Sequence, residues 1–340
     1  MPSGSARTTL ATVAASAGVS VATVSKVING RTDVSPTTRA RVQALLRQHD
    51  YVSRRVPAGG TPSIALLFQN DLNAYMTEIM NGALDAAADL TVSVVVSVLS
   101  LAKGTSEPTD WAKDVIAAGR KAVVAVTTEL TASDVGALSR ARLPLVVVNP
   151  LTTPHARLTS VGSTDFSGGI AATNHLLALG HRKIGYIGGA PLAPCNQARM
   201  AGFRSAMHAA GAPVIEEYLR SEQEAYDDGV ASGAELMDLR DRPTALLAFN
   251  DEVALGVLEA ARTRGLRVPA ELSVVGFDDT QMARLSSPPL TTVRQPLREM
   301  GAVALRTAVQ LSAGARVDFR HIELATELVV RGSTAQPDAP

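Results

Sequence analysis

Clusters of side-chain hydrogen-bond acceptors recur along this chain, each directly after a run of apolar residues. They are Asn70–Asp71, Asn149–Pro150, Asn250–Asp251 and Asp278–Asp279. Amide and carboxylate oxygens accept hydrogen bonds from hydroxyl groups, so they suit a small polar ligand. If the apolar runs are parallel strands, the clusters lie at the carboxyl ends of those strands, where open α/β sheets bind ligands. The alternative is that some of them, Asp251 and Asp279 especially, cap helices or form turns.

Residues 10–29 form a second group with a recognisable chemistry. Their sequence, LATVAASAGVSVATVSKVIN, spaces apolar residues three and four apart, which predicts two short packed helices joined by a tight turn. Gly18 stands at that turn, where we expect a side chain to clash, and Ser20 is placed to cap the second helix. The helix face that carries Val21 and Lys26 is not needed for packing. It is therefore available to DNA, as in a helix-turn-helix.

Charge is divided unevenly along the 340 residues, although the whole chain is neutral, with 32 Lys and Arg against 32 Asp and Glu. Residues 1–55 hold eight basic and two acidic side chains, a net charge of +6, which leaves −6 for the remainder. A basic head on an acidic body indicates a domain that binds a polyanion. The alternative is a basic helical domain that only keeps the N-terminus in solution.

The elements that position these groups follow from the hydrophobic pattern. A third helix is expected from Pro36 to about Gln48, with Ser35 as its cap. Apolar runs then alternate with amphipathic stretches, which predicts βαβ units in two parallel sheets, and two similar lobes enclose a cleft. The expected strands are 64–68, 92–98, 122–126, 145–148, 184–187, 245–249 and 273–277, and the expected helices are 74–88, 111–118, 133–140, 166–179, 197–210, 229–239 and 252–264.

Several classes of protein are excluded by missing motifs. The sequence has no GxxxxGK[ST] loop, no GxSxG elbow and no GxGxxG after a strand, and its six histidines do not pair at metal-ligand spacing. His175 and His181 flank a helix end and are expected to be surface or helix-capping groups. No run is long enough to span a membrane, the N-terminus has no signal segment, and the single cysteine, Cys195, excludes an internal disulfide. We expect a cytoplasmic, nucleoid-associated protein with no catalytic residue, metal or cofactor, and neither an α/β enzyme nor a secreted solute-binding protein.

The chain resembles the LacI/GalR family of bacterial repressors over almost its entire length. In the head the similarity rests on Thr12–Val13–Ala14, Ala17–Gly18–Val19–Ser20, Thr23–Val24–Ser25 and Val27–Ile28–Asn29. In the core it rests on GHRKIGYIGG, ARMAGF, FNDEVALG and PPLTTVRQP, which begin at residues 180, 198, 249 and 288. The resemblance implies a small all-α helix-turn-helix head followed by a two-lobed, periplasmic-binding-protein-like α/β core with parallel sheets. It also implies a homodimeric repressor whose cleft binds a small effector, most often a sugar, and whose lobe closure controls the binding of operator DNA.

The resemblance also implies site residues, carried over by position. Those implied in DNA binding are Ser20, Val21, Ala22, Thr23, Ser25, Lys26, Asn29 and Arg39, of which Val21, Ala22 and Lys26 read bases. In the core, Arg199 matches the residue that clamps the effector, and the residues that match holders of sugar hydroxyls are Asn149, Asn250, Asp278 and Gln295. Tyr75 either stacks on a sugar ring or packs in the core. Cys195 either lines the cleft or is a small buried apolar residue.

We expect the head at residues 1–51, a linker at 52–63 and the core at 64–340. Within the core, the N-terminal lobe comprises about 64–161 and 291–319, and the C-terminal lobe about 162–290 and 320–331.

The linker departs from the family pattern. Val56–Gly60 is shorter than the usual hinge helix, has no Leu and contains Pro and Gly. Either Val56 wedges into the minor groove or the operator has a weak central kink. The choice between inducer and corepressor also stays open, because it depends on which lobe arrangement fits DNA.

Overall fold

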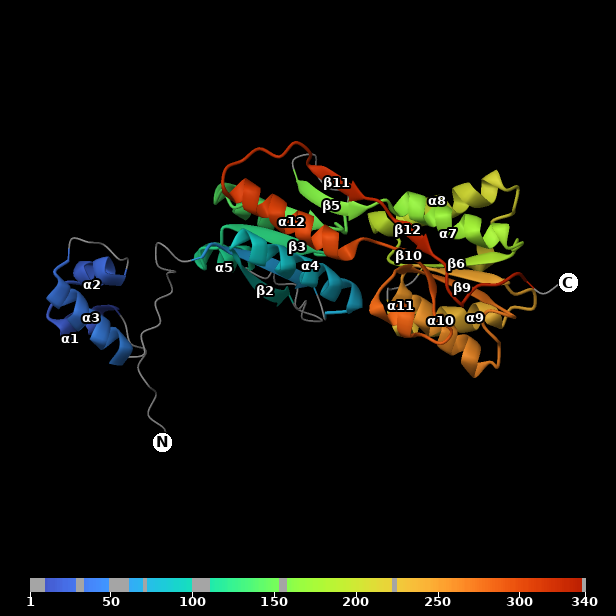
Figure 1. The fold of residues 1–340 in the computed structure, drawn as a ribbon, viewed down its shortest axis with the longest axis horizontal. Coiled ribbons are helices and arrows are strands. Elements are labelled where there is room, and N and C mark those ends of the chain that lie inside the picture. The colour runs from blue at the N-terminus through green and yellow to red at the C-terminus, as the bar shows by residue number, and fades with distance from the viewer. Residues whose placement is uncertain are drawn as a thin grey trace, which may run out of the picture.

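The computed structural model describes residues 10–28, 34–48, 61–69, 72–99, 111–152, 158–221 and 225–337. Within these ranges, a three-helix head precedes two α/β lobes (Figure 1). Asn29, the Asn70–Asp71 cluster and the linker around Val56 lie outside the described residues, so the expectations for them stay predictions. In the part of the chain that is described, no helix combines the length and the apolar character that crossing a membrane requires.

The head consists of α1 (Leu10–Ala17), α2 (Val21–Ile28) and α3 (Pro36–Gln48). Both expected caps are confirmed, because Ser20 Oγ accepts from the Thr23 amide at 3.1 Å and Ser35 Oγ accepts from the Thr38 amide at 3.2 Å. The three helices enclose an apolar core of Val13, Ala14, Ala17, Val24, Val27, Val34 and Val42. The expected clash at Gly18 is wrong. A Cβ there would meet open space, and the residue is required by its φ of +62° instead.

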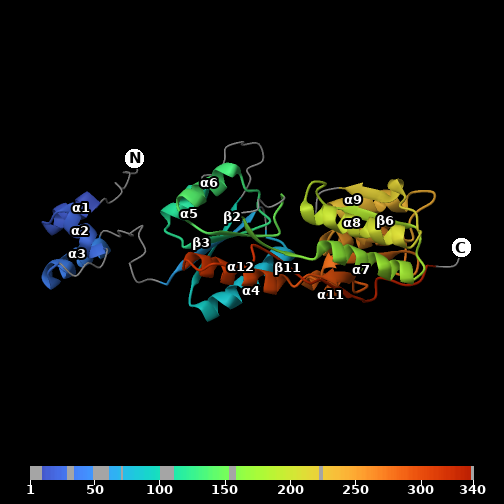
Figure 2. The same cartoon turned by 90° about the horizontal axis from the view of Figure 1, so that it is seen from above.

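The N-terminal lobe is built on a fully parallel six-stranded sheet in the order β11-β5-β4-β3-β1-β2. The strands are β1 (Ser63–Gln69), β2 (Ser93–Leu99), β3 (Ala122–Val126), β4 (Leu145–Val148), β5 (Thr159–Ser163) and β11 (His321–Leu324). Helices α4 (Ala74–Leu90) and α12 (Leu297–Ser312) cover one face, and α5 (Trp111–Ala117) and α6 (Ala132–Arg140) cover the other (Figure 2). Strands β1 and β3 are buried throughout, as expected for a sheet covered on both faces.

The C-terminal lobe repeats this plan with the order β12-β10-β9-β8-β6-β7, in which β12 alone is antiparallel. Its strands are β6 (Ile184–Gly188), β7 (Leu219–Ser221), β8 (Ala245–Ala248), β9 (Ser273–Asp278), β10 (Thr291–Arg294) and β12 (Glu327–Val329). One face packs against α7 (Asp165–Ala178) and α8 (Pro194–Ala209), and the other against α9 (Tyr226–Met237) and α10 (Asp251–Thr263) (Figure 1). Two short helices, η1 (Glu216–Tyr218) and α11 (Gln281–Leu285), complete the lobe.

The chain passes between the lobes three times: from β5 to α7, from β10 to α12 and from β11 to β12. These crossovers fall a few residues after the expected boundaries. The expected boundaries put 291–294 in the N-terminal lobe and 321–324 in the C-terminal lobe, whereas β10 joins the C-terminal sheet and β11 joins the N-terminal sheet. Both strands are short and partly polar, TTVR and HIEL, so no apolar run marks them. Their sheet membership is decided by the partners they meet in space.

Three helix pairs pack unusually closely: α4 with α12, α7 with α8, and α9 with α10. Each helix contributes a glycine at which an added Cβ would lie within 2.4 Å of a backbone oxygen of the partner helix; these are Gly82, Gly301, Gly169, Gly202, Gly229 and Gly256. In the α9–α10 pair, a Cβ at Gly256 would lie 2.2 Å from the Tyr226 oxygen. The backbones can approach this closely only because no side chain intervenes.

We predict that Gly256→Ala lowers the free energy of unfolding by about 1–3 kcal/mol, because the new methyl group must push α9 and α10 apart. Alanine gains about 1 kcal/mol of helix propensity over glycine, which works against this loss. Gly136→Ala in α6 is the matched control, since its nearest atom is the flexible end of Arg140 at 3.3 Å. Urea unfolding of both variants measures the difference. Equal stabilities would contradict the close-packing explanation.

Candidate functional site

A cavity of about 510 Å³ lies between the two lobes. The N-terminal lobe contributes Asn149 and residues of β5 and β11, and the C-terminal lobe contributes the first turns of α7 and α8. A second cavity, of about 620 Å³, lies inside the N-terminal lobe beside α6 and β4 and is lined mainly by apolar side chains. The interlobe cavity is the candidate site, because it joins both lobes and contains residues singled out by the sequence.

Arg199 lies directly behind the cavity wall on the side of the C-terminal lobe, because its partner Asp165 and its neighbour Ala198 line the cavity whereas Arg199 does not. Its side chain is 3% exposed, its Nε donates to Asp165 Oδ1 at 2.8 Å, and its Nη1 donates to the Phe249 carbonyl at 2.6 Å. The guanidinium group lies 4.6 Å from the Phe249 ring centre and 3.7 Å from that of Phe277. Burial lowers the pKa of Arg199, but the carboxylates of Asp165 and Asp278 raise it by a larger amount, so the net shift is upward. The positive charge is therefore permanent and held in one orientation.

Asp278 ends β9 close to this arginine and is joined to the crossovers by hydrogen bonds. Gln295 Nε2 donates to Asp278 Oδ1 at 2.6 Å, and Ser163 Oγ donates to Gln295 Oε1 at 2.7 Å. Burial raises the pKa of Asp278 well above its usual range, with partial opposition from Arg199. The bonds connect the cleft to the first two crossovers, because Ser163 precedes one and Gln295 lies in the other.

Two buried side-chain oxygens have no hydrogen-bond partner among the described residues: Tyr75 Oη and Thr127 Oγ1. Tyr75 lies in the first turn of α4, and burial raises the pKa of its hydroxyl well above the usual value, with a further contribution from the charge of Asp278. Thr127 directly follows β3 with a φ of 44°, as Asn149 follows β4 with a φ of 48°. A buried polar atom without a partner is uncommon, and a bound ligand is one way to supply the partner.

The structure brings most of the expected effector residues together. Arg199 and Asp278 lie close enough for the charge of each to shift the pKa of the other, Gln295 is bonded to Asp278, and Asn149 lines the cavity. Asn250 caps α10, since its Oδ1 accepts from the Val253 amide at 2.8 Å, and its expected contact with a sugar hydroxyl stays a prediction.

Cys195 satisfies both alternatives left open by the sequence. It lines the cavity at the first turn of α8 and is 5% exposed.

Sequence reasoning missed Asp165 and Thr127. Asp165 follows β5, whose sequence TSVGS has no apolar run to mark a strand end. Thr127 did carry a signal, because it directly follows the apolar run of β3. The predicted clusters at the strand ends consist of Asn and Asp acceptors, and they do not include this threonine hydroxyl.

Of the two alternatives for His181, a surface group or a helix cap, the surface position is wrong. Its side chain is 1% exposed, Nδ1 lies 2.9 Å from Thr244 Oγ1, and Nε2 lies 2.9 Å from the Ala335 carbonyl. Burial lowers the pKa of His181, which keeps the ring neutral near pH 7. The residue fastens the C-terminal segment to the lobe. His175 is half-buried and contacts the same segment, with Nε2 lying 2.9 Å from Thr334 Oγ1.

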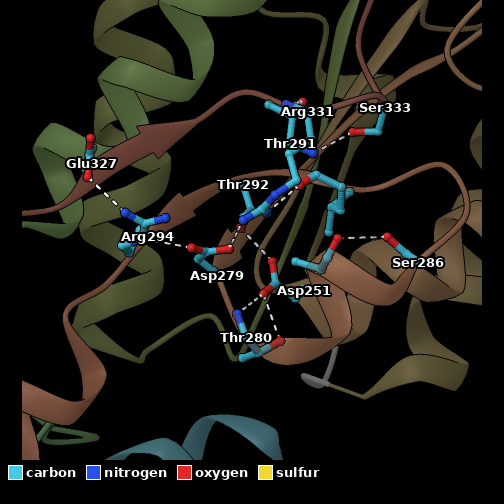
Figure 3. Close-up of polar contacts among 12 residues, drawn as sticks. Asp251, Asp279, Thr280, Ser286, Thr291, Thr292, Arg294, Glu327, Arg331 and Ser333 are labelled. Carbon is cyan, nitrogen blue, oxygen red and sulfur yellow. Dashed lines mark hydrogen bonds and ion pairs between the residues drawn. The ribbon is translucent and has the colours of Figure 1, made fainter.

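The turn after β9 is held by Asp251, the first residue of α10 (Figure 3). Its Oδ2 accepts from the amide and the hydroxyl of Thr280 at 2.7 and 2.9 Å, and its Oδ1 accepts from Thr292 Oγ1 at 2.6 Å. Asp278 and Asp279 both have positive φ, 113° and 56°, a region that non-glycine residues rarely occupy. The hydrogen bonds from Thr280 to Asp251 fix the residue that follows Asp279, and they therefore hold the strained turn in place.

Asp279 is tied down from the other side. It pairs with Arg294 at 2.7 Å and with Arg331 at 2.5 Å, and Arg294 also reaches Glu327 at 3.2 Å (Figure 3). Asp251 and Asp279 are therefore a helix start and a turn anchor, which agrees with the structural alternative for these two residues.

We predict that Asp251 makes stability depend on pH. Burial raises its pKa to about 6, although hydrogen bonds from Thr292 and Thr280 oppose this. A carboxyl with a raised pKa stabilises the fold below its unfolded pKa of about 3.9, and this contribution is lost as the pH rises through about 6. The free energy of unfolding of the wild type minus that of Asp251→Asn should therefore fall by about 2 kcal/mol between pH 4 and pH 7.

Urea unfolding at a series of pH values measures this difference. Asp238→Asn is the control with the opposite sign, because a hydrogen bond from Arg264 lowers the pKa of Asp238. A difference that rises with pH for Asp251→Asn would contradict the assignment.

In the head, the expected DNA-reading face is open to solvent. Val21 is 46% exposed, and Ala22 and Lys26 are also exposed. Ser20 caps α2, and its Oγ lies 2.9 Å from Thr23 Oγ1. The remaining described candidates, Thr23, Ser25 and Arg39, are half-buried. An exposed valine at the start of a helix contributes nothing to the head's core, which leaves it free to contact a partner.

Comparison with protein families supports both parts of this picture. Residues 9–53 match the family described as bacterial regulatory proteins, lacI family, and residues 173–334 match the periplasmic binding protein-like domain. The HTH-type transcriptional regulator DegA of Bacillus subtilis (strain 168) is 33% identical over 334 residues, which cover 97% of this chain and 98% of DegA.

Two solved structures extend the comparison. The complex of the transcriptional regulator CelR with cellobiose has a TM-score of 0.74 and 31% identity, and the match covers 96% of this chain and 100% of CelR. The lac repressor dimer bound to operator and the anti-inducer ONPF has a TM-score of 0.71 and 27% identity, covering 97% of this chain and 100% of the repressor chain.

Proposed function

This chain belongs to the lacI family of bacterial regulatory proteins and is a DNA-binding transcriptional regulator, not an enzyme, and we propose that it is a repressor controlled by a sugar or sugar derivative. The observation that supports the effector site is the buried pair of Arg199 and Asp165 at the interlobe cavity, which Asp165 lines, together with the unpartnered buried hydroxyl of Tyr75. Fixed donors and acceptors of this kind suit a polyol, whose hydroxyls are costly to bury without partners.

For DNA binding, the proposal places α2 in the major groove. Val21, Ala22 and Lys26 read base edges, while Ser20, Thr23, Ser25, Asn29 and Arg39 contact the backbone or support the helix. The net charge of +6 on residues 1–55 supports this, because neutralising phosphates is the main source of affinity for DNA. A homodimer would present two heads to a pseudo-palindromic operator in the nucleoid.

For control, the proposal uses the three crossovers. Effector bound to Asp278 must share that carboxylate with Gln295, which is bonded to Ser163 of the first crossover. Occupation of the cleft therefore acts directly on the segments about which the lobes move. Whether the bound state favours or weakens operator binding depends on the lobe arrangement that fits DNA, so both an inducer and a corepressor remain compatible with this geometry.

We predict that Lys26→Ala relaxes sequence discrimination, with a loss of about 1–3 kcal/mol for the preferred base pair. Electrophoretic mobility shifts on a selected operator and on single-base variants provide the measurement. Arg41→Ala is the matched control, because it removes one exposed positive charge from α3 of the same head. If Lys26→Ala weakens binding equally on all sequences, Lys26 contacts phosphate instead of a base.

We predict that Asp278→Ala weakens effector binding by about 2–5 kcal/mol, because it removes a buried hydrogen-bonding carboxyl group and leaves donors unpaired. The measurement is titration calorimetry with whichever sugar stabilises the wild type in a thermal-shift screen. Circular dichroism and thermal unfolding report that the lobes of the variant are folded, which operator binding alone does not, since the head has its own core. Wild-type effector affinity in this variant would show that Asp278 is not part of the site.

A further inference from the structure

The larger of the two cavities lies inside the N-terminal lobe, on a face of the sheet that helices cover only in part. Helix α6 and strand β4 line it, and the described residues between β4 and β5 contain no helix that would extend the cover beyond α6. Its volume of about 620 Å³ is typical of sites for small ligands, which measure about 300–1,000 Å³. The cavity adjoins the interlobe cavity at Pro150, which lines both.

The lining of this cavity is mainly apolar, and none of its described residues is charged. It includes Leu138 and Val147, which are buried, and Val135, which is 37% exposed. The hydroxyl of Thr128, which also lines the cavity, donates to the Val126 carbonyl at 2.9 Å, so it needs no further acceptor. An apolar group suits this lining, because a polar group buried there would lose hydrogen bonds to water without replacing them.

A positive charge lies at the edge of the cavity. Arg140 is the last residue of α6 and is exposed, and its guanidinium bends back along the helix. Nη1 lies 3.3 Å from the point that a Cβ on Gly136 would occupy, and Gly136 lines the cavity.

The side chain of Arg140 makes no hydrogen bond or ion pair within the part of the chain that the structure describes. An arginine at a helix C-terminus is favourable by itself, because that end of a helix attracts cations. The helix end does not use the planar fork of N–H groups, however, and such a fork binds a carboxylate through two parallel hydrogen bonds. The position over Gly136 brings this fork to the edge of an apolar cavity.

We propose that this cavity binds a small apolar carboxylic acid, with its ring or branched chain against α6 and β4 and its carboxylate on Arg140. The apolar lining selects the body of the ligand, and the unpaired guanidinium selects the charge of its end. The site is separate from the proposed effector site and does not depend on the proposed function.

The first experiment compares three ligands by titration calorimetry with the full chain at constant ionic strength: naphthoate, its neutral counterpart naphthylmethanol, and acetate. Naphthoate should bind saturably, and naphthylmethanol about twofold to fivefold more weakly, as expected for the loss of an exposed ion pair. Acetate should show no saturable binding, because burial of the ring supplies most of the affinity. Absence of naphthoate binding, or acetate binding of equal strength, would overturn the proposal.

The second experiment tests the contact with the carboxylate. Arg140→Gln should reduce the affinity for naphthoate to that for naphthylmethanol and leave naphthylmethanol binding unchanged. Arg284→Gln is the matched control, because it removes an exposed positive charge from α11 in the other lobe. Equal effects of the two substitutions on naphthoate binding would show an effect of net charge and would overturn the assignment of Arg140.

The third experiment locates the apolar part of the ligand. Ser139 and Ser133 are both exposed on α6, but only Ser139 lines the cavity. Ser139→Phe should weaken the binding of both naphthyl compounds at least about tenfold by filling the space for the ring, whereas Ser133→Phe should bind them as the wild type does.

If Ser139→Phe fails to fold, Val135→Asp replaces it. This substitution puts a carboxylate at a partly exposed position of the lining, and Ser133→Asp is its control. Val135→Asp should also weaken the binding of both naphthyl compounds at least about tenfold, because their rings would lie against a charged group. Equal affinities in either matched pair would place the ring elsewhere and overturn the proposal.

Discussion

The buried ion pair between Arg199 and Asp165 depends on how closely α7 and α8 approach each other. A Cβ at Gly169 would lie 2.4 Å from the Arg199 carbonyl oxygen, and one at Gly202 would lie 2.3 Å from the Phe166 oxygen. The two glycines therefore bring the backbones to a distance at which the guanidinium reaches the start of the neighbouring helix. Burial of two charges is favourable only with good geometry and further hydrogen bonds. The packing of α7 against α8 provides the good geometry, and the Phe249 carbonyl, which accepts from Arg199 Nη1, provides one further hydrogen bond.

Side-chain hydrogen bonds also link the three crossovers where the two lobes join. Thr164 Oγ1 lies 3.0 Å from Thr326 Oγ1, which links the first crossover to the third, and Gln295 links the second to the first through Ser163. Since side-chain hydrogen bonds connect all three crossovers, a conformational change in one crossover affects the other two. The hydrogen bond from Gln295 to Asp278 makes the cleft a member of this set. Hinge and ligand site are thus parts of one bonded network.

Features that depend on residues close together in the sequence were predicted well, and features that depend on distant residues were not. The head helices were predicted with their caps, because Ser20 and Ser35 act on amides three residues away. The buried strands were found because a parallel sheet covered on both faces requires continuous apolar runs. Strands β5, β10 and β11 carry no such run, so the pattern does not mark them, and β11 in addition pairs with β5, which is far away in the sequence.

The candidate site divides in the same way. Arg199 and Asp278 were identified from motifs that continue into neighbouring helices and strands. Asp165 was missed because its role depends on a partner 34 residues away on another helix. His181 was misplaced because the Ala335 carbonyl that it contacts is 154 residues further along the chain. Contacts of this range leave no periodic pattern, so only the folded chain shows them.

Three passages between the lobes mean that neither lobe is a continuous stretch of sequence. The N-terminal lobe needs α12 and β11, and the C-terminal lobe needs β10, β12 and the segment that reaches Ala335. Chains are synthesised from the N-terminus, so the three helices of the head emerge complete long before either lobe can close. A nascent or prematurely ended chain that stops before residue 321 thus holds every element of the head and neither finished sheet. Such a fragment keeps the DNA-binding helices of the head and lacks the complete lobes that an effector would need to control them.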